Sequence, residues 1–181
     1  MQPTSPIGGS HLKVTVDTNI VIYSDQNLPE SASCRQIFEL ARQRIVDVAV
    51  VPDFDFDGPQ GLALRRVVRG ENIEGFLTRI RQVYRPPFAN PPPAPPALAP
   101  DKVLEAGIIG CLKPEAGRTW RILKKTDKMD VNHLMAHAQN GRDLFITCDK
   151  RILKKHACLS VLGIRVITPN DFIQAWRAIR R

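Results

Sequence analysis

Aspartate residues stand just beyond short apolar runs of the sequence and at the start of one helical pattern. They are Asp17, the alternating Asp53, Asp55 and Asp57, then Asp130 and Asp149. Carboxylates that gather without compensation repel one another, and a divalent cation removes that repulsion. Ligand sets made only of oxygen suit Mg²⁺ or Mn²⁺, and such an ion polarises a phosphate and activates a water. These acids therefore predict a metal site for phosphodiester chemistry, provided that the fold brings them together.

The elements that must position these acids can be read from hydrophobic periodicity. Short runs rich in β-branched residues predict strands at 11–17, 45–51, 143–147 and 164–168. Helical spacing between them predicts helices at 27–44, 61–69, 73–84, 101–112, 115–124, 126–141, 148–155 and 169–181. Alternating strands and helices imply a parallel sheet covered on both faces. The predicted fold class is α/β, a three-layer α/β/α sandwich around a central, mostly parallel sheet.

Such a sheet gives the acids a common location, because ligands bind beyond the carboxyl ends of its strands. Asp17 ends the first predicted strand, and Asp149 comes two residues after the third. Asp130 lies in the first turn of the helix that leads into the third strand. We therefore predict that Asp17, Asp130 and Asp149 hold the metal ion. One of the three alternating aspartates completes the set or, on the plainer interpretation, all three form an acidic loop.

Polar residues beside these acids are of the type that orients a ligand. Asn19 and Thr147 can hydrogen-bond a ligating carboxylate or a water, although ordinary turn and strand-end hydrogen bonds also account for them. His133 and His137 lie four residues apart on a predicted helix, but no HExxH motif or third ligand accompanies them. Zinc is therefore not predicted, and His133 is interpreted as a hydrogen-bonded or substrate-facing residue.

The charge of the chain indicates a polyanionic partner. The 181 residues carry a formal net charge of +8, with a pI near 9.7. A basic surface favours nucleic acid, although a charge that merely keeps the protein in solution is the plainer alternative. Basic clusters occur at 64–69, 121–125 and 150–155. Lys150 and Arg151 follow the predicted metal ligand Asp149 directly, so we predict that they contact the phosphate backbone.

The length and composition predict one domain. Residues 1–12 are interpreted as a flexible lead-in and 13–181 as a single domain, with a proline-rich insertion at 86–100 that holds eight of the 15 prolines. No run is long and apolar enough for a membrane span, and the N-terminus lacks the features of a secretory signal. The four cysteines form no CxxC pair, so reduced thiols in a cytoplasmic protein are expected.

Three segments, taken in their order along the chain, resemble the PIN-domain nuclease family. They are VTVDTNIVI at 14–22, DVNHLMAHAQNGRDLFITCDKRIL at 130–153 and GIRVITPNDF at 163–172. The family's opening Asp-Thr-Asn is matched by Asp17, Thr18 and Asn19. Its later aspartate, often followed by a histidine three residues on, is matched by Asp130 and His133. Its final acid beyond a strand that ends in threonine is matched by Asp149.

The resemblance implies a PIN-like fold and a Mg²⁺- or Mn²⁺-dependent endoribonuclease that leaves a 5′-phosphate and a 3′-hydroxyl. It also implies RNA as the substrate, and many compact bacterial members are toxins that form homodimers and are held in check by a cognate antitoxin. The chain departs from the family in its second acid, since no glutamate stands in the helix after the second strand. Among Asp53, Asp55 and Asp57, position favours Asp57.

Two alternatives remain open from the sequence. The missing glutamate allows a non-catalytic nucleic-acid- or partner-binding module on the same fold. FDFDGP at 54–59 also resembles the haloacid dehalogenase-type phosphatase motif, with Asp55 as nucleophile and Asp57 as acid/base. Pro59 stands where that motif has threonine, and Asp17 would be left without a role.

Overall fold

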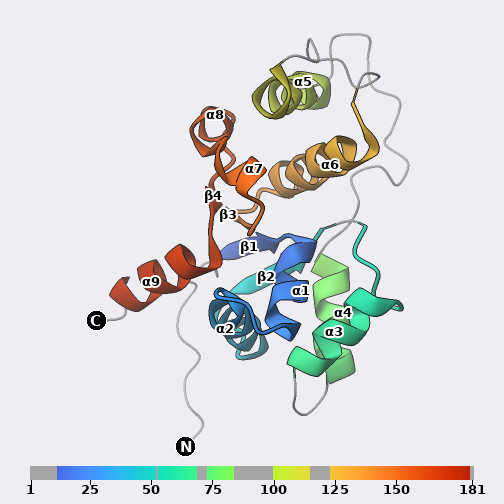
Figure 1. Cartoon of the computed structure of the whole chain (residues 1–181), viewed down its shortest axis with the longest axis vertical. Coiled ribbons are helices and arrows are strands. Elements are labelled where there is room, and N and C mark those ends of the chain that lie inside the picture. The colour runs from blue at the N-terminus through green and yellow to red at the C-terminus, as the bar shows by residue number, and fades with distance from the viewer. Residues whose placement is uncertain (1–11, 52, 69–72, 84–99, 115–122, 180–181) are drawn as a thin grey trace, which may run out of the picture.

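The computed structural model describes residues 12–51, 53–68, 73–83, 100–114 and 123–179 (Figure 1). Its strands form one all-parallel sheet in the order β2-β1-β3-β4. The strands are β1 Lys13–Val16, β2 Asp47–Val50, β3 Leu144–Ile146 and β4 Val166–Ile167. Each lies within a run that predicted a strand, so the predicted α/β class with a parallel sheet is confirmed.

The helices cover the two faces of this sheet (Figure 1). They are α1 Thr18–Asp25, α2 Ser31–Arg42, α3 Pro59–Val67, α4 Ile73–Val83, α5 Pro100–Leu112, α6 Lys125–Gln139, α7 Lys150–Leu153, α8 His156–Val161 and α9 Pro169–Ile179. Helix α6 packs on one face, where buried Ala136 meets Ala49 of β2. Alternation along β1 sends Val14 and Val16 to the other face, in one buried cluster with Phe38 of α2. The result is a three-layer arrangement.

The strand register brings the carboxyl ends of the three central strands level. Val16 pairs with Val50 on one side and with Ile146 on the other. The residues that follow these positions are Asp17, Val51 and Thr147. Segments that are more than a hundred residues apart in sequence therefore meet at one edge of the sheet.

Helix α1 was not predicted. Of the predicted helix 115–124, the structure describes only residues 123–124, and these are not helical. Residues 18–25, TNIVIYSD, give little of the spacing of apolar residues, three or four positions apart, that identifies a helix. The helix forms because the Asp17 carboxylate accepts a hydrogen bond from the Thr18 N–H at its start. Residues 115–122 lie outside the described residues, as do 1–11 and 86–99, so the predicted lead-in and most of the proline-rich insertion do too.

The expectation of four reduced thiols is wrong for two of them. Cys111 at the end of α5 and Cys158 in α8 form a disulfide, with their Cα atoms 5.7 Å apart. Their sequence separation of 47 residues carries no pairing signal, and only the contact of α5 with α8 brings them together. Cys34 and Cys148 remain free thiols. Over the described ranges, no helix has the length and apolar character needed to cross a membrane.

Candidate functional site

A pocket of about 280 Å³ opens beyond the carboxyl ends of β1, β2 and β3. Four aspartates from four separate segments line it, namely Asp17, Asp53, Asp130 and Asp149. Three of these are the predicted metal ligands. Of the three alternating aspartates, Asp53 lines the pocket, whereas Asp55 and Asp57 are not among the described residues that line it.

Asp17 is held by a hydrogen-bond network that ties the end of β1 to the end of β3. Its Oδ1 accepts from the Thr18 N–H at 2.7 Å, and its Oδ2 accepts from Asn19 Nδ2 and Thr147 Oγ1, both at 2.8 Å. The Cys148 N–H in turn donates to Asn19 Oδ1 at 3.2 Å. Asn19 and Thr147 therefore lie where the sequence suggested, on the carboxylate that they would orient.

The turn after β2 decides which alternating aspartate reaches the pocket. Asp55 Oδ1 accepts from the N–H groups of Asp57 and Gly58, at 3.2 and 2.8 Å, which folds the Asp55 side chain back onto the backbone before α3. Asp57 lies beyond this turn and is exposed. Asp53 lies before it and contacts His133. The structure therefore places Asp53 in the pocket and not Asp57, which chain position had favoured, because chain position alone gave no information about this turn.

His133 on α6 lies between two of the acids. Its Nε2 is 2.5 Å from Asp53 Oδ1, and its Nδ1 is 3.6 Å from Asp17 Oδ1. Burial favours the neutral ring, but the interactions with Asp17 and Asp53 outweigh it and raise the pKa of His133 to about 9. Burial also opposes ionisation of Asp53, yet its contact with His133 lowers the pKa of that carboxyl. The pair is therefore ionised at neutral pH.

Arg151 on α7 spans the other two acids. Its Nη2 donates to Asp149 Oδ2 at 2.7 Å and to Asp130 Oδ2 at 3.2 Å. Asp149 also caps α7 by accepting from the Arg151 N–H at 2.7 Å. Burial works against the ionised form of Asp149, but these bonds lower its pKa. For Asp130, burial raises the pKa to about 6, Arg151 opposes the shift, and the charges of Asp149 and Asp17 add to it.

The charges in the pocket do not balance. Four carboxylates face the His133 imidazolium and the Arg151 guanidinium, so four negative charges against two positive ones leave two uncompensated. An all-oxygen donor set with this charge suits Mg²⁺ or Mn²⁺. The acids are held in two pairs, however, and within the described ranges no three Asp, Glu, His or Cys side chains form a group close enough to hold an ion.

The fit to a metal is therefore one of residue type and location, and it requires Arg151 to leave Asp130 and Asp149. The Arg151 side chain is 61% exposed, so it can swing into solvent without disturbing the core. Lys150, the other predicted phosphate contact, is exposed beside it at the start of α7.

Several pocket residues were missed in the sequence. Thr126 and Met129 line it from the first turns of α6, together with Gln60 of α3. Thr126, Met129, Asp130 and His133 have the spacing of one helical face, so this periodicity, applied to polar as well as apolar residues, would have identified the α6 members. No sequence signal identified Gln60, whose side chain accepts from the Asp55 N–H at 2.8 Å.

Comparisons with known proteins add no family assignment: no family model, no curated protein and no solved structure matches this chain. The resemblance to PIN-domain nucleases therefore rests on the motifs in the sequence.

His137, one turn after His133, belongs to the core rather than to the pocket. It is 1% exposed, its Nδ1 lies 3.0 Å from Thr15 Oγ1, and its ring packs edge-on against Phe145. Burial, with the nearby charge of Arg142, lowers the pKa of His137 to about 4. The two histidines therefore lie in different surroundings, His133 at the pocket and His137 in the core.

Acidification is expected to destabilise the fold through His137. Between the ordinary histidine pKa of 6.5 and the folded value of about 4, the unfolded chain binds the proton and the folded chain does not. The free energy of unfolding should therefore fall as pH drops through this window, with about 3 kcal/mol coming from this residue. Urea denaturation at a series of pH values should show a shallower dependence for His137→Gln. The exposed-site control His156→Gln should keep the wild-type dependence, and equal slopes for all three proteins would contradict the assignment.

Proposed function

We propose that this protein is a metal-dependent endoribonuclease that uses Asp17, Asp53, Asp130 and Asp149. The observation that supports it is the convergence of these four acids, from four segments, on one pocket at the carboxyl edge of the sheet. When bound there, Mg²⁺ or Mn²⁺ would activate a water and polarise the phosphodiester. The resemblance to PIN-domain nucleases supplies the choice of RNA.

The residues of the chain have distinct roles in this proposal. Asn19 and Thr147 fix the orientation of Asp17, so this carboxylate meets its ligand without having to reorganise. The His133 imidazolium lies against Asp53 and Asp17 and holds positive charge beside the reacting phosphate. Arg151 occupies Asp130 and Asp149 until a ligand displaces it, and its exposed guanidinium can then contact the substrate phosphate.

Partners follow from charge and from the resemblance. The net charge of +8, with Lys150 and Arg151 both exposed at the start of α7, supports a polyanion. A cognate antitoxin and a homodimer are the protein partners that the resemblance proposes.

Cleavage of end-labelled single-stranded RNA tests the proposal. We expect products with a 5′-phosphate and a 3′-hydroxyl in Mn²⁺ or Mg²⁺, and no cleavage in EDTA. Cleavage that persists in EDTA would overturn the metal-dependent mechanism. The complete absence of cleavage with either ion would overturn the enzyme assignment.

The second candidate is a nucleic-acid-binding module without catalysis. It is favoured by the pairing of the acids with Arg151 and His133, which neutralises part of the pocket without any metal. This candidate predicts RNA that is bound and left intact in every metal, equally by the wild type and by Asp17→Asn. A phosphatase that uses Asp55 is not proposed, because the Asp55 carboxylate accepts hydrogen bonds in the turn before α3 and is not among the described residues that line the acidic pocket.

A further inference from the structure

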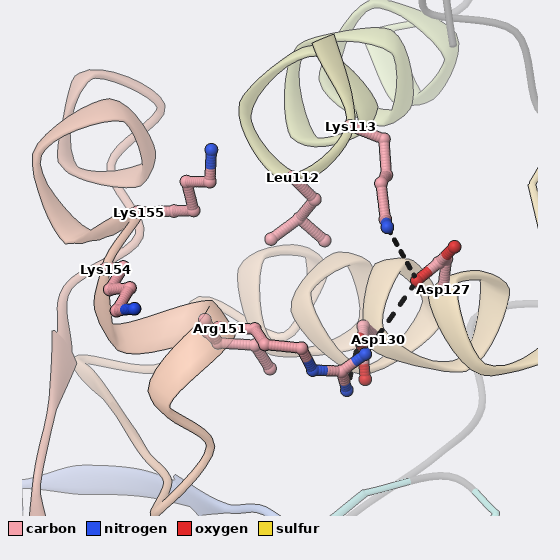
Figure 2. A pocket seen from close by; sticks show the side chains of 8 residues that line it. Leu112, Lys113, Asp127, Asp130, Arg151, Lys154 and Lys155 are labelled. Atoms are coloured by element: carbon pink, nitrogen blue, oxygen red, sulfur yellow. Dashed lines mark hydrogen bonds and ion pairs between the residues drawn. The ribbon is translucent and has the colours of Figure 1, made fainter. Parts of the chain in front are cut away.

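A second pocket, of about 250 Å³, adjoins the acidic one and is predominantly basic (Figure 2). Lys113 follows α5, Arg151 lies in α7, and Lys154 and Lys155 separate α7 from α8. The two carboxylates that line it are Asp127 and Asp130. Four positive charges against two negative ones leave this pocket with a formal charge of +2, opposite in sign to its neighbour.

The buried carboxylate of Asp127 holds the cationic groups of Lys113 and Arg151 in place. Asp127 is 6% exposed, and its Oδ1 lies 3.5 Å from Lys113 Nζ and 3.9 Å from Arg151 Nη1. A single buried carboxylate thus holds two donors beside each other (Figure 2). Lys155 lies on the opposite side of the pocket (Figure 2), and within the described part of the chain neither it nor Lys154 forms an ion pair.

The two pockets share Asp130 and Arg151. A nucleic-acid strand with one phosphate in the acidic pocket would therefore bring a neighbouring phosphate close to the lysines of the basic pocket. Lysine ammonium groups are compact point charges that suit the phosphate backbone, and they carry no preference for a base.

We propose that Lys113, Lys155 and Arg151 form a subsite for a backbone phosphate of the RNA strand, next to the phosphate that is cleaved. The place of this subsite next to a cleaved phosphate rests on the proposed function. The binding of a backbone phosphate by these side chains does not, because it does not require that the neighbouring phosphate is cut. The subsite sets the path of the strand, which runs from the acidic pocket between the C-terminal end of α5 and the segment that joins α7 to α8.

Binding of a short, labelled single-stranded RNA in EDTA, measured by fluorescence anisotropy over a series of salt concentrations, tests the subsite without any cleavage. Lys113→Gln and Lys155→Gln should each weaken binding, and each should reduce the slope of log K against log salt by about 0.7. Lys102→Gln is the matched control. Lys102 is exposed on α5, the helix that Lys113 follows, but it lines a different pocket. Lys113→Arg should restore most of the slope, which separates loss of charge from misfolding.

Wild-type affinity and slope in both glutamine variants would overturn the subsite, whether or not the wild type cleaves RNA. A lysine-dependent slope in a protein that cuts no RNA in Mn²⁺ would keep the subsite and overturn the nuclease proposal. Inorganic phosphate provides the last arm. Phosphate should weaken RNA binding more than chloride does at equal ionic strength, because it competes for the same lysines. A phosphate effect that depends on Lys113 and Lys155 while both glutamine variants keep the wild-type RNA affinity and slope would assign the pocket to a free phosphate and overturn the backbone assignment.

Discussion

Replacement of Asp17 by asparagine is expected to reduce Mn²⁺-dependent RNA cleavage by more than about 100-fold, because loss of an outer partner of a metal ligand alone costs about 10–100-fold. Asparagine keeps the shape of the side chain but removes the charge that would bind the ion. It also disturbs the network, since Asp17 Oδ1 accepts from Thr18 and Oδ2 accepts from Asn19 and Thr147. An amide NH2 group in either place cannot accept those bonds. Initial cleavage rates at saturating Mn²⁺, with circular dichroism to verify folding, measure the effect.

The location of Asp53 in the pocket, with Asp57 outside it, gives this experiment an internal comparison. Asp53→Asn should impair cleavage strongly. Asp57→Asn should retain most of the cleavage activity, because Asp57 lies beyond the turn and outside the pocket. Asp101→Asn, at the exposed start of α5, is the surface control. A larger loss in Asp57→Asn than in Asp53→Asn would reject the assignment of the second acid.

Loss of the disulfide is expected to have the largest effect on stability. Cys111 and Cys158 close a loop over a sequence separation of 47 residues, for which the chain-entropy model gives about 4 kcal/mol. The bond also joins the two sides of the basic pocket, since Cys111 precedes Lys113 by two residues and Cys158 follows Lys155 by three. Urea denaturation of Cys158→Ser should therefore show a lower free energy of unfolding than that of the wild type.

Free-thiol titration provides the control for this prediction. Two reactive thiols, from Cys34 and Cys148, are expected in the unfolded, unreduced protein, and four after reduction. Four thiols before reduction, with equal stability of the wild type and Cys158→Ser, would contradict the bond. The same titration on protein from cells bears on the compartment, because disulfides are rare in a reducing cytoplasm, which is the location predicted from the sequence.

The sheet was predictable because its signals are local. Runs of β-branched residues identify strands, and parallel connectivity places their carboxyl ends at one edge. That was sufficient to bring Asp17 and Asp149 together in prediction, with Asp130 delivered by the helix that leads into β3. The observed pocket contains all three.

What the sequence did not predict depends on contacts between distant segments. The choice of Asp53 over Asp57 is made by two backbone hydrogen bonds to Asp55. The disulfide depends on the packing of α5 against α8. The pairing of Arg151 with two acids was also hidden, since a basic residue after Asp149 suggested a contact with substrate rather than an internal counter-charge.

Direct binding of Mn²⁺, followed by the paramagnetic resonance signal of the free ion, tests the convergence of the acids on one cation without any substrate. The wild type should bind Mn²⁺, and Asp130→Asn and Asp149→Asn should lose that binding. Affinity should weaken as pH falls below about 6, because a proton on Asp130 then competes with the metal. Arg151→Gln should bind Mn²⁺ more tightly than the wild type, since the guanidinium that occupies Asp130 and Asp149 is gone. A wild-type protein that binds no Mn²⁺, or binding that survives unchanged in Asp130→Asn, would contradict the metal site.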